Sequence, residues 1–219
     1  MLKSFSKRLA RWIPNHISAK FVVTVYRILD VLCIGRGSVR KKHETYNCHV
    51  LNSEVSPLKA GYVENQAKWS EVKYGKTDMA FAGCEVLAVY NALLAIGMTG
   101  GAGKMAELIR HFEGHGAALH GIIGTSPWAM YKYLKKQGIQ AKVVWKEEEL
   151  SNTAKATIVT MYNNCFDLYD QIHTVSYNHE AEGVVSHNAS SDGKYFEDIY
   201  EAVRGAGENA KMICAIEIQ

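Results

Sequence analysis

The spacing of apolar residues changes once along this chain, at Gly138, and this change constrains the fold more than any other sequence feature. Before Gly138 apolar residues recur at helical spacing, whereas after it short runs alternate as in β-strands. Helices are expected at residues 85–96, 104–112 and 127–137, and strands at 140–145, 156–162, 173–177, 183–187 and 212–218. Helices followed by strands indicate an α+β domain, with a helical lobe packed against an antiparallel β-sheet.

The segment 85–96 is apolar on every side and ends before Gly97. A helix of this kind is buried, so we expect it to be the central helix of the lobe. A short acidic helix is expected at residues 147–154 and a late helix at 195–203. The 3 prolines and 47% hydrophobic residues of the 219-residue chain are consistent with one sizeable core.

Positive charge is concentrated at the amino terminus. Residues 1–43 contain ten Lys or Arg and only one acidic residue, Asp30, so this segment carries nine net positive charges. The chain as a whole carries +3, which leaves the rest at −6 and argues against a nucleic-acid partner. We expect residues 1–49 to form a basic arm of two amphipathic helices with a loop at 35–42, and residues 50–219 to form the main domain. The arm either packs on the body as a hairpin or contacts a membrane surface or protein partner through residues 1–43.

Neither metal chemistry nor a membrane span has support in the sequence. The five cysteines are widely spaced without a CxxC pair, so we expect reduced thiols, no metal and no cofactor. The longest apolar run, 21–32, is interrupted by Arg27 and Asp30, so it is not expected to cross a bilayer, and no secretory signal follows. A cytoplasmic location is expected, with membrane association or non-classical export as alternatives.

Cys84 is placed as a nucleophile would be, at the start of the central helix. Free backbone N–H groups at a helix amino terminus favour the thiolate, so we expect the pKa of this thiol to be lowered. The alternative is that Cys84 is a small buried hydrophobic residue, as many cysteines are.

A predicted hairpin supplies candidate partners for Cys84. Strands 173–177 and 183–187 flank a turn-rich stretch, and a turn centred between Glu180 and Ala181 would pair His173 with Asn188. Directly opposed residues have Cβ atoms about 5 Å apart, close enough for an amide oxygen to accept the imidazole N–H and orient the ring. This pair would be the base and the orienting group of a nucleophilic site, provided that the register is correct.

Residues 60–219 resemble the papain-like cysteine peptidases, and in particular the stand-alone relatives of the bacterial double-glycine leader (bacteriocin-processing) peptidases. The resemblance is carried, in the family's order, by Gln66-Ala-Lys-Trp69, Tyr74-Gly75, Ala82-Gly83-Cys84, Gly124-Thr125-Ser126-Pro127, His173-Thr-Val-Ser-Tyr177 and Val184-Val-Ser-His-Asn188. It implies a papain-like fold, a peptide or protein substrate, and a Cys84-His173-Asn188 triad in which Gln66 donates to the oxyanion.

The resemblance therefore predicts a cysteine peptidase that works through a thioester intermediate. Where family members commonly have Gly-Cys-Gly-Pro and Asp-Pro, this chain has Glu85-Val86 after the cysteine and Ala189 after Asn188. An amidase, a deamidase or an acyltransferase on the same scaffold is the nearest alternative. The other alternative is a catalytically silent binding domain, because Glu85 opposes ionisation of the thiol.

Overall fold

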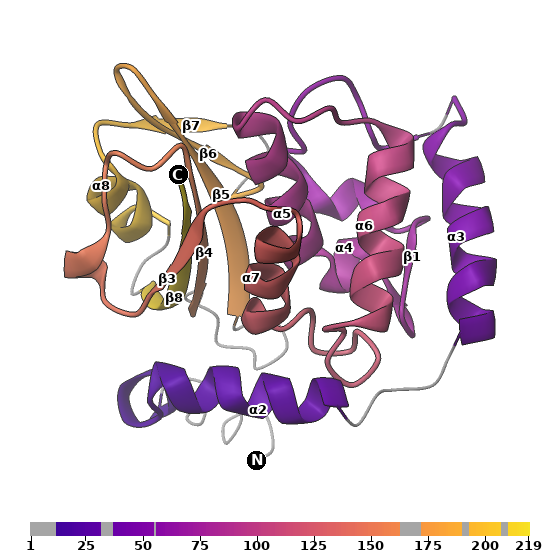
Figure 1. Cartoon of the computed structure of the whole chain (residues 1–219), viewed down its shortest axis with the longest axis horizontal. Helices are drawn as coiled ribbons and strands as arrows, with labels where there is room; N and C mark the ends of the chain where they lie inside the picture. Colours follow the sequence, from indigo (N-terminus) through magenta and orange to yellow (C-terminus); the bar gives the residue numbers. More distant parts are fainter. Residues whose placement is uncertain (1–11, 32–36, 55, 163–171, 190–192, 207–209) are drawn as a thin grey trace, which may run out of the picture.

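The structure is a computed structural model that describes residues 12–31, 37–54, 56–162, 172–189, 193–206 and 210–219. A six-stranded antiparallel sheet forms one layer, and a group of helices packs against it (Figure 1). The strand order is β3-β8-β4-β5-β6-β7. These strands are β3 (Ala141–Val144), β4 (Ala156–Tyr162), β5 (Ile172–Glu180), β6 (Gly183–His187), β7 (Lys194–Phe196) and β8 (Lys211–Ile218). The expected α+β class is confirmed.

The helical layer is built around α5 (Cys84–Ala95), which packs on β4 and β5. Ten of its twelve residues are buried, as its all-round apolar sequence predicts. The short helix α4 (Met79–Ala82) precedes it, and α6 (Ala102–Gly114) and α7 (Pro127–Lys136) pack against it. A 3₁₀ turn, η1 (Gln66–Trp69), lies beside α4, close to the two-stranded ribbon of β1 (Lys73–Tyr74) and β2 (Thr77–Asp78).

The sheet is covered on both faces. Ile158 and Ile216 belong to the core shared with the helical layer, whereas Val159 and Ala215 face a second core. Helix α8 (Ile199–Arg204) closes that second core on the far side of the sheet (Figure 1). Alternate residues of β4 and β8 therefore face opposite cores, which is why β4 is buried along its whole length and β8 along all but its first residue.

The β5–β6 hairpin differs from its predicted register. Ser176 pairs with His187 and Glu180 with Gly183, so the turn is the two-residue segment 181–182. The predicted direct pairing of His173 with Asn188 is wrong, because the turn is centred one residue further along the chain than expected. His173 instead pairs with Met161 of the neighbouring strand β4, and Asn188 lies just beyond the end of β6.

Two further predictions about secondary structure are wrong in part. The acidic helix expected at 147–154 is only a 3₁₀ turn, η2 (Glu147–Glu149). The late helix expected at 195–203 begins later, at Ile199 with Asp198 as its cap, because β7 takes the preceding residues into the sheet edge.

Two helices near the amino terminus pack on the body. Helix α2 (Ala19–Val31) runs beneath the sheet and α7, and contacts both α7 and β8 (Figure 1). Helix α3 (Gly37–Leu51) packs against α6. The basic loop expected at 35–42 is therefore helical from Gly37 onward, whereas most of the first amphipathic helix lies outside the described residues, as do Cys33 and Cys165. Within the described ranges, no helix combines the length and apolar character needed to cross a bilayer.

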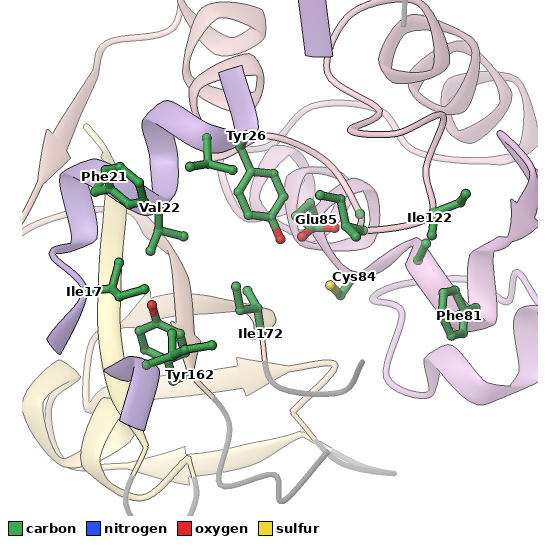
Figure 2. Close-up of a pocket in the computed structure, with 15 residues that line it drawn as sticks. Ile17, Phe21, Val22, Tyr26, Phe81, Cys84, Glu85, Ile122, Tyr162 and Ile172 are labelled. Atoms are coloured by element: carbon green, nitrogen blue, oxygen red, sulfur yellow. The ribbon is translucent and has the colours of Figure 1, made fainter. Parts of the chain in front are cut away.

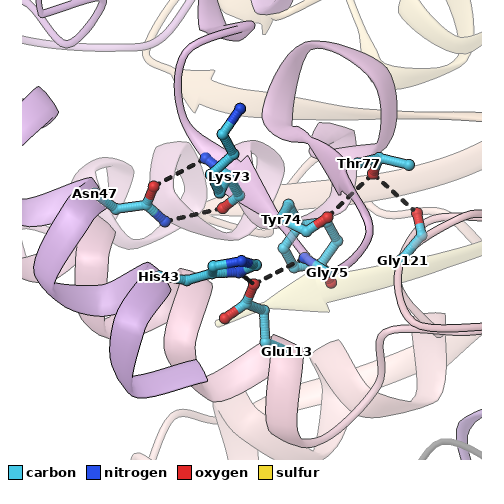
Figure 3. Close-up of polar contacts among 8 residues, drawn as sticks. All are labelled: His43, Asn47, Lys73, Tyr74, Gly75, Thr77, Glu113 and Gly121. Atoms are coloured by element: carbon cyan, nitrogen blue, oxygen red, sulfur yellow. Dashed lines mark hydrogen bonds and ion pairs between the residues drawn. The ribbon is translucent and has the colours of Figure 1, made fainter. Parts of the chain in front are cut away.

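Polar contacts fix α3 to the body (Figure 3). The buried Asn47 side chain pairs with the main chain of Lys73, accepting its N–H at 2.8 Å and donating to its carbonyl oxygen at 2.9 Å. One Glu113 carboxylate oxygen contacts His43 Nδ1 at 2.6 Å and accepts the Gly75 N–H at 2.7 Å. These polar contacts, together with the buried Val50 and Leu51 at the end of α3, hold this helix on the body although its sequence has no apolar stripe.

Candidate active site

Cys84 is the first residue of α5, and a sharp turn between two helices sets its position. Asp78 caps α4 by accepting the Phe81 N–H at 2.9 Å, and the chain then turns at Gly83 into α5. A Cβ atom at Gly83 would lie 2.5 Å from the Met79 carbonyl oxygen. Only glycine permits this close approach, so the Gly83-Cys84 pair is required by the geometry that presents the thiol.

The pKa of the Cys84 thiol is raised, mainly by burial and then by the neighbouring Glu85 carboxylate. The backbone N–H of Thr174, which contacts the thiol, opposes this effect. The expectation of a lowered pKa is therefore wrong for this arrangement, because desolvation and the adjacent acid outweigh the helix terminus. The Thr174 contact nevertheless places the thiol next to the residue that follows His173.

Glu85 was noted in the sequence as an acid beside the nucleophile, but its burial was not expected. Its side chain is buried and is bonded to the Cys84 thiol and to the backbone of residues 85 and 125. Burial raises the pKa of Glu85 to about 7, although these hydrogen bonds favour the ionised form. Its Oε2 atom has no hydrogen-bond partner among the described residues.

His173, Asn188 and Gln66 form one hydrogen-bonded group. His173 Nε2 lies 2.9 Å from the main-chain oxygen of Asn188. Because a carbonyl oxygen only accepts, Nε2 carries the proton, and in the neutral ring Nδ1 is then the acceptor nitrogen. The Asn188 side chain bonds Gln66 instead of the imidazole: its Oδ1 accepts the Gln66 N–H at 3.0 Å, and its Nδ2 donates to Gln66 Oε1 at 3.1 Å.

The Gln66 side chain is held at both ends of its amide. Besides accepting from Asn188, it donates one Nε2 hydrogen to the Ala80 carbonyl oxygen at 2.9 Å. A primary amide has two such hydrogens, so one remains for another acceptor. Gln66 opens the 3₁₀ turn η1, which Asn65 caps by accepting the Ala67 N–H. The predicted residues Gln66, His173 and Asn188 are thus brought together. The Cys84 thiol contacts the backbone of Thr174, which follows His173 in β5.

Glu64 is a residue that sequence reasoning missed. Its carboxylate pairs with His187 Nδ1 and accepts the Asn188 N–H at 3.4 Å. Tyr62 stacks on the His187 ring with centroids 4.0 Å apart. Asn188 itself has a φ of 65°, a left-handed conformation that Asn tolerates better than most residues. These contacts fix the turn that aims the Asn188 carbonyl at His173, and no local pattern in the sequence marks them.

A cavity of about 540 Å³ opens beside Cys84 (Figure 2). Figure 2 shows the Cys84 sulfur directed toward the space between Tyr26 and Ile172, with the Tyr26 hydroxyl pointing toward Glu85. One wall comes from α2 and the residues before it, so the amino-terminal segment encloses part of the site. The nearby Glu85 and Cys84 also raise the pKa of Tyr26, after burial as the main cause.

The described residues contain no group of three or more His, Cys, Asp or Glu side chains suited to hold a metal ion. In comparisons with known proteins, the chain matches no family model, no curated protein and no solved structure.

Proposed function

We propose that the chain is a cysteine peptidase with a papain-like fold, in which Cys84 is the nucleophile and His173 the general base. The observation that carries this proposal is the hydrogen-bonded group of His173, Asn188 and Gln66, together with the contact of the Cys84 thiol with Thr174, the residue that follows His173. A thiol at a helix start, an oriented imidazole and an amide donor are the parts that acyl transfer through cysteine requires.

In the proposed reaction His173 Nδ1 accepts the thiol proton, and the resulting thiolate attacks the carbonyl carbon of a peptide bond. The carbonyl oxygen that becomes negative is stabilised by the Cys84 backbone N–H and the remaining Nε2 hydrogen of Gln66. His173 then protonates the departing amine, leaving an acyl group on the sulfur. Water, deprotonated by His173, hydrolyses this thioester and restores the thiol.

Asn188 has a different orienting role from the one expected. Its main-chain oxygen, rather than its side-chain amide, accepts the His173 Nε2–H, while its side chain positions Gln66. A carbonyl oxygen fixes the imidazole tautomer as well as an amide oxygen does. The proposed site therefore still consists of a nucleophile, a base and a group that orients the base, but the orienting atom is a backbone oxygen.

Acid-quenched single-turnover reactions test the proposal. A mixture of peptides is mixed with excess protein, the reaction is stopped in acid, and mass spectrometry locates any acyl group on the protein. We expect a thioester on Cys84 in the wild type and none in Cys84→Ala or His173→Ala. Acyl transfer from small amides but not from peptides would instead indicate an amidase, a deamidase or an acyltransferase.

One observation favours a second candidate, a papain-like domain that binds a partner without catalysis. The raised pKa of Cys84, caused by burial and by Glu85, keeps the thiol protonated at neutral pH in this arrangement. On that account no acyl group would form on Cys84 with any substrate. Cys84→Ala would then bind the same partner with unchanged affinity, which separates this candidate from the peptidase.

A further inference from the structure

The cavity beside Cys84 has the size and lining of a ligand site. Its volume of about 540 Å³ falls within the range of about 300–1,000 Å³ that is common for small-molecule pockets. Most of its lining is aliphatic or aromatic, contributed both by the amino-terminal segment and by the body of the domain. Three of these apolar side chains are markedly exposed, namely Phe21 at 58%, Phe81 at 50% and Ile122 at 37%. Apolar groups therefore continue from the interior of the cavity to its mouth.

The charges around the cavity are one-sided. Glu85 lines it and is buried, whereas no Lys or Arg is found among its described lining residues. A negatively charged ligand would lose its hydration there and meet a carboxylate without a compensating cation. The lining therefore disfavours anions, including a free fatty acid.

Two buried polar atoms in the lining of this cavity have no hydrogen-bond partner among the described residues. They are Glu85 Oε2 and the Tyr162 hydroxyl oxygen. Buried polar atoms are usually hydrogen-bonded, so each of these two atoms can still take a hydrogen bond from a bound ligand. Both groups can serve an amide or ester of a ligand, since the hydroxyl donates and the Glu85 oxygen accepts an N–H or, when protonated, donates.

We propose that this cavity binds an uncharged, apolar group attached next to the carbonyl that Cys84 attacks. The inference rests on the proposed function for the reacting carbonyl, and it adds the substrate class: acyl donors that carry an aliphatic or aromatic group. Two sources share this chemistry, a fatty-acyl ester or thioester and a peptide with a large apolar residue. The apolar group leaves water for the space beneath α2 while the carbonyl stays at the sulfur.

Alkyl thiosulfonates test the cavity without requiring turnover. In this reaction the Cys84 thiolate attacks the sulfenyl sulfur, a disulfide forms, and methanesulfinate leaves with the electron pair of the broken S–S bond. Methyl, butyl and octyl methanethiosulfonate present the same reactive group with increasing apolar length, and the sulfonatoethyl reagent adds a negative charge. Rates are measured at a pH of about 9, where a larger fraction of the thiol is ionised than at neutral pH, by peptide mapping with mass spectrometry. Each rate is divided by the rate of the same reagent with glutathione.

We expect the normalised rate at Cys84 to rise about ten-fold or more from methyl to octyl, because apolar area leaves water. The sulfonatoethyl reagent should react about ten-fold more slowly than the butyl reagent. Cys48, which does not line the cavity, should show neither trend. Equal normalised rates at Cys84 for all chain lengths would overturn the proposal.

A matched pair of variants excludes nonspecific partition of the long reagent. Ile122→Asp places a charge in the cavity wall, whereas Leu119→Asp places it on the same loop at a residue of similar exposure that does not line the cavity. We expect Ile122→Asp to remove the octyl preference at Cys84, measured as the ratio of the octyl rate to the methyl rate within each variant, and Leu119→Asp to leave this ratio unchanged. Loss of the octyl preference in both variants would contradict the assignment of the alkyl group to this cavity.

Substrate turnover then separates the two sources and the two proposals. Hydrolysis of an octanoyl thioester identifies the fatty-acyl source, and hydrolysis of a peptide amide with Leu or Phe next to the scissile bond identifies the peptide source. Suppose that the labelling rate at Cys84 rises with alkyl length but no substrate forms a thioester on Cys84. This result would support binding of apolar groups in the cavity and contradict the proposed peptidase. Hydrolysis of peptides without chain-length preference supports the peptidase and overturns the cavity assignment.

Discussion

Asn188 and Gln66 bind each other twice, through the Gln66 main-chain N–H to Asn188 Oδ1 at 3.0 Å and through Asn188 Nδ2 to Gln66 Oε1 at 3.1 Å. The residue expected to orient the base therefore orients the proposed oxyanion donor. The two are 122 positions apart in the chain, so this pair also ties the helical layer to the end of β6. Changes at Asn188 should act on catalysis through Gln66.

Gln66→Ala and Asn188→Ala are expected to be strongly non-additive. Losing one oxyanion donor costs about 10²–10³ in kcat, and Asn188→Ala should approach this loss because Gln66 is then free to turn away. The double variant should be at most a few-fold slower than Gln66→Ala. Steady-state kinetics on any substrate found by acyl trapping measures all three. Losses that multiply would show that the two residues act independently.

Asn188→Asp should lose as much activity as Asn188→Ala. A carboxylate can still accept the Gln66 N–H, but its second oxygen would face Gln66 Oε1, with no hydrogen between them. Gln66 would rotate its amide to bond the carboxylate and withdraw Nε2 from the oxyanion site. A kcat for Asn188→Asp close to that of the wild type would instead mean that the side-chain bond to Gln66 is dispensable.

Glu85→Gln should change the pH dependence of stability. The folded pKa of Glu85 is about 7 against an ordinary value of 4.5, so the native state keeps a proton that the unfolded chain releases between these values. Stability of the wild type therefore falls as pH rises through this interval, by roughly 3 kcal/mol in total. Urea unfolding should show that Glu85→Gln lacks this decrease and is the more stable protein at pH 8. The exposed control Glu148→Gln should follow the wild type, and parallel curves for all three proteins would contradict the assignment.

The reactivity of Cys84 toward iodoacetamide should be low at neutral pH and rise in alkaline buffer. Burial first, and the Glu85 carboxylate second, raise the pKa of this thiol, so little thiolate is present near neutrality. Glu85→Gln should shift the pH midpoint of labelling downward, and Glu148→Gln should not. Peptide mapping separates Cys84 from Cys48. A midpoint well below about 8.5 in the wild type would contradict the burial argument.

Asn47→Ala should destabilise the fold by about 1–3 kcal/mol, because it leaves the N–H and carbonyl of Lys73 without their side-chain partner. Asn52→Ala is the matched control, since Asn52 lies just past the end of the same helix but is exposed and bonds only the nearby Cys48 carbonyl. Thermal unfolding measures both. Equal melting temperatures for the two variants would mean that α3 is attached by other contacts.

Most of the secondary structure was predictable because it depends on local periodicity. The helices at residues 85–96, 104–112 and 127–137 and the five expected strands all correspond to observed elements, with ends shifted by a few residues. Helix α3 was missed because its sequence has no apolar stripe, and the contacts of Asn47 and Glu113 that hold it involve residues distant in the chain. Strand β7 was missed for the same kind of reason, since β6 alone pairs with it.

The residue types of the candidate site were predictable from the sequence, but the hydrogen bonds between these residues were not. The order of motifs identified Cys84, His173, Asn188 and Gln66; the last three form one hydrogen-bonded group, whereas the Cys84 thiol contacts Thr174, the residue after His173. The hairpin register was wrong because composition locates a turn only approximately, and a shift of its centre by one residue moves every cross-strand pair by two. The burial of Glu85 and the link from Glu64 to the Asn188 turn depend on segments that meet only in three dimensions.

The position of β8 in the middle of the sheet has a consequence for synthesis of the protein. Strands β3 and β4 are neighbours in sequence but are separated in the sheet by β8, which pairs with both. On the ribosome β4, β5 and β6 can pair as they emerge, yet β3 cannot join them until residues 211–218 have followed. Until then one edge of β4 has unpaired backbone N–H and C=O groups, which can pair with strands of other chains. The nascent chain thus passes through a stage in which both Cys84 and His173 have been made, but the sheet beneath them is still open on one side.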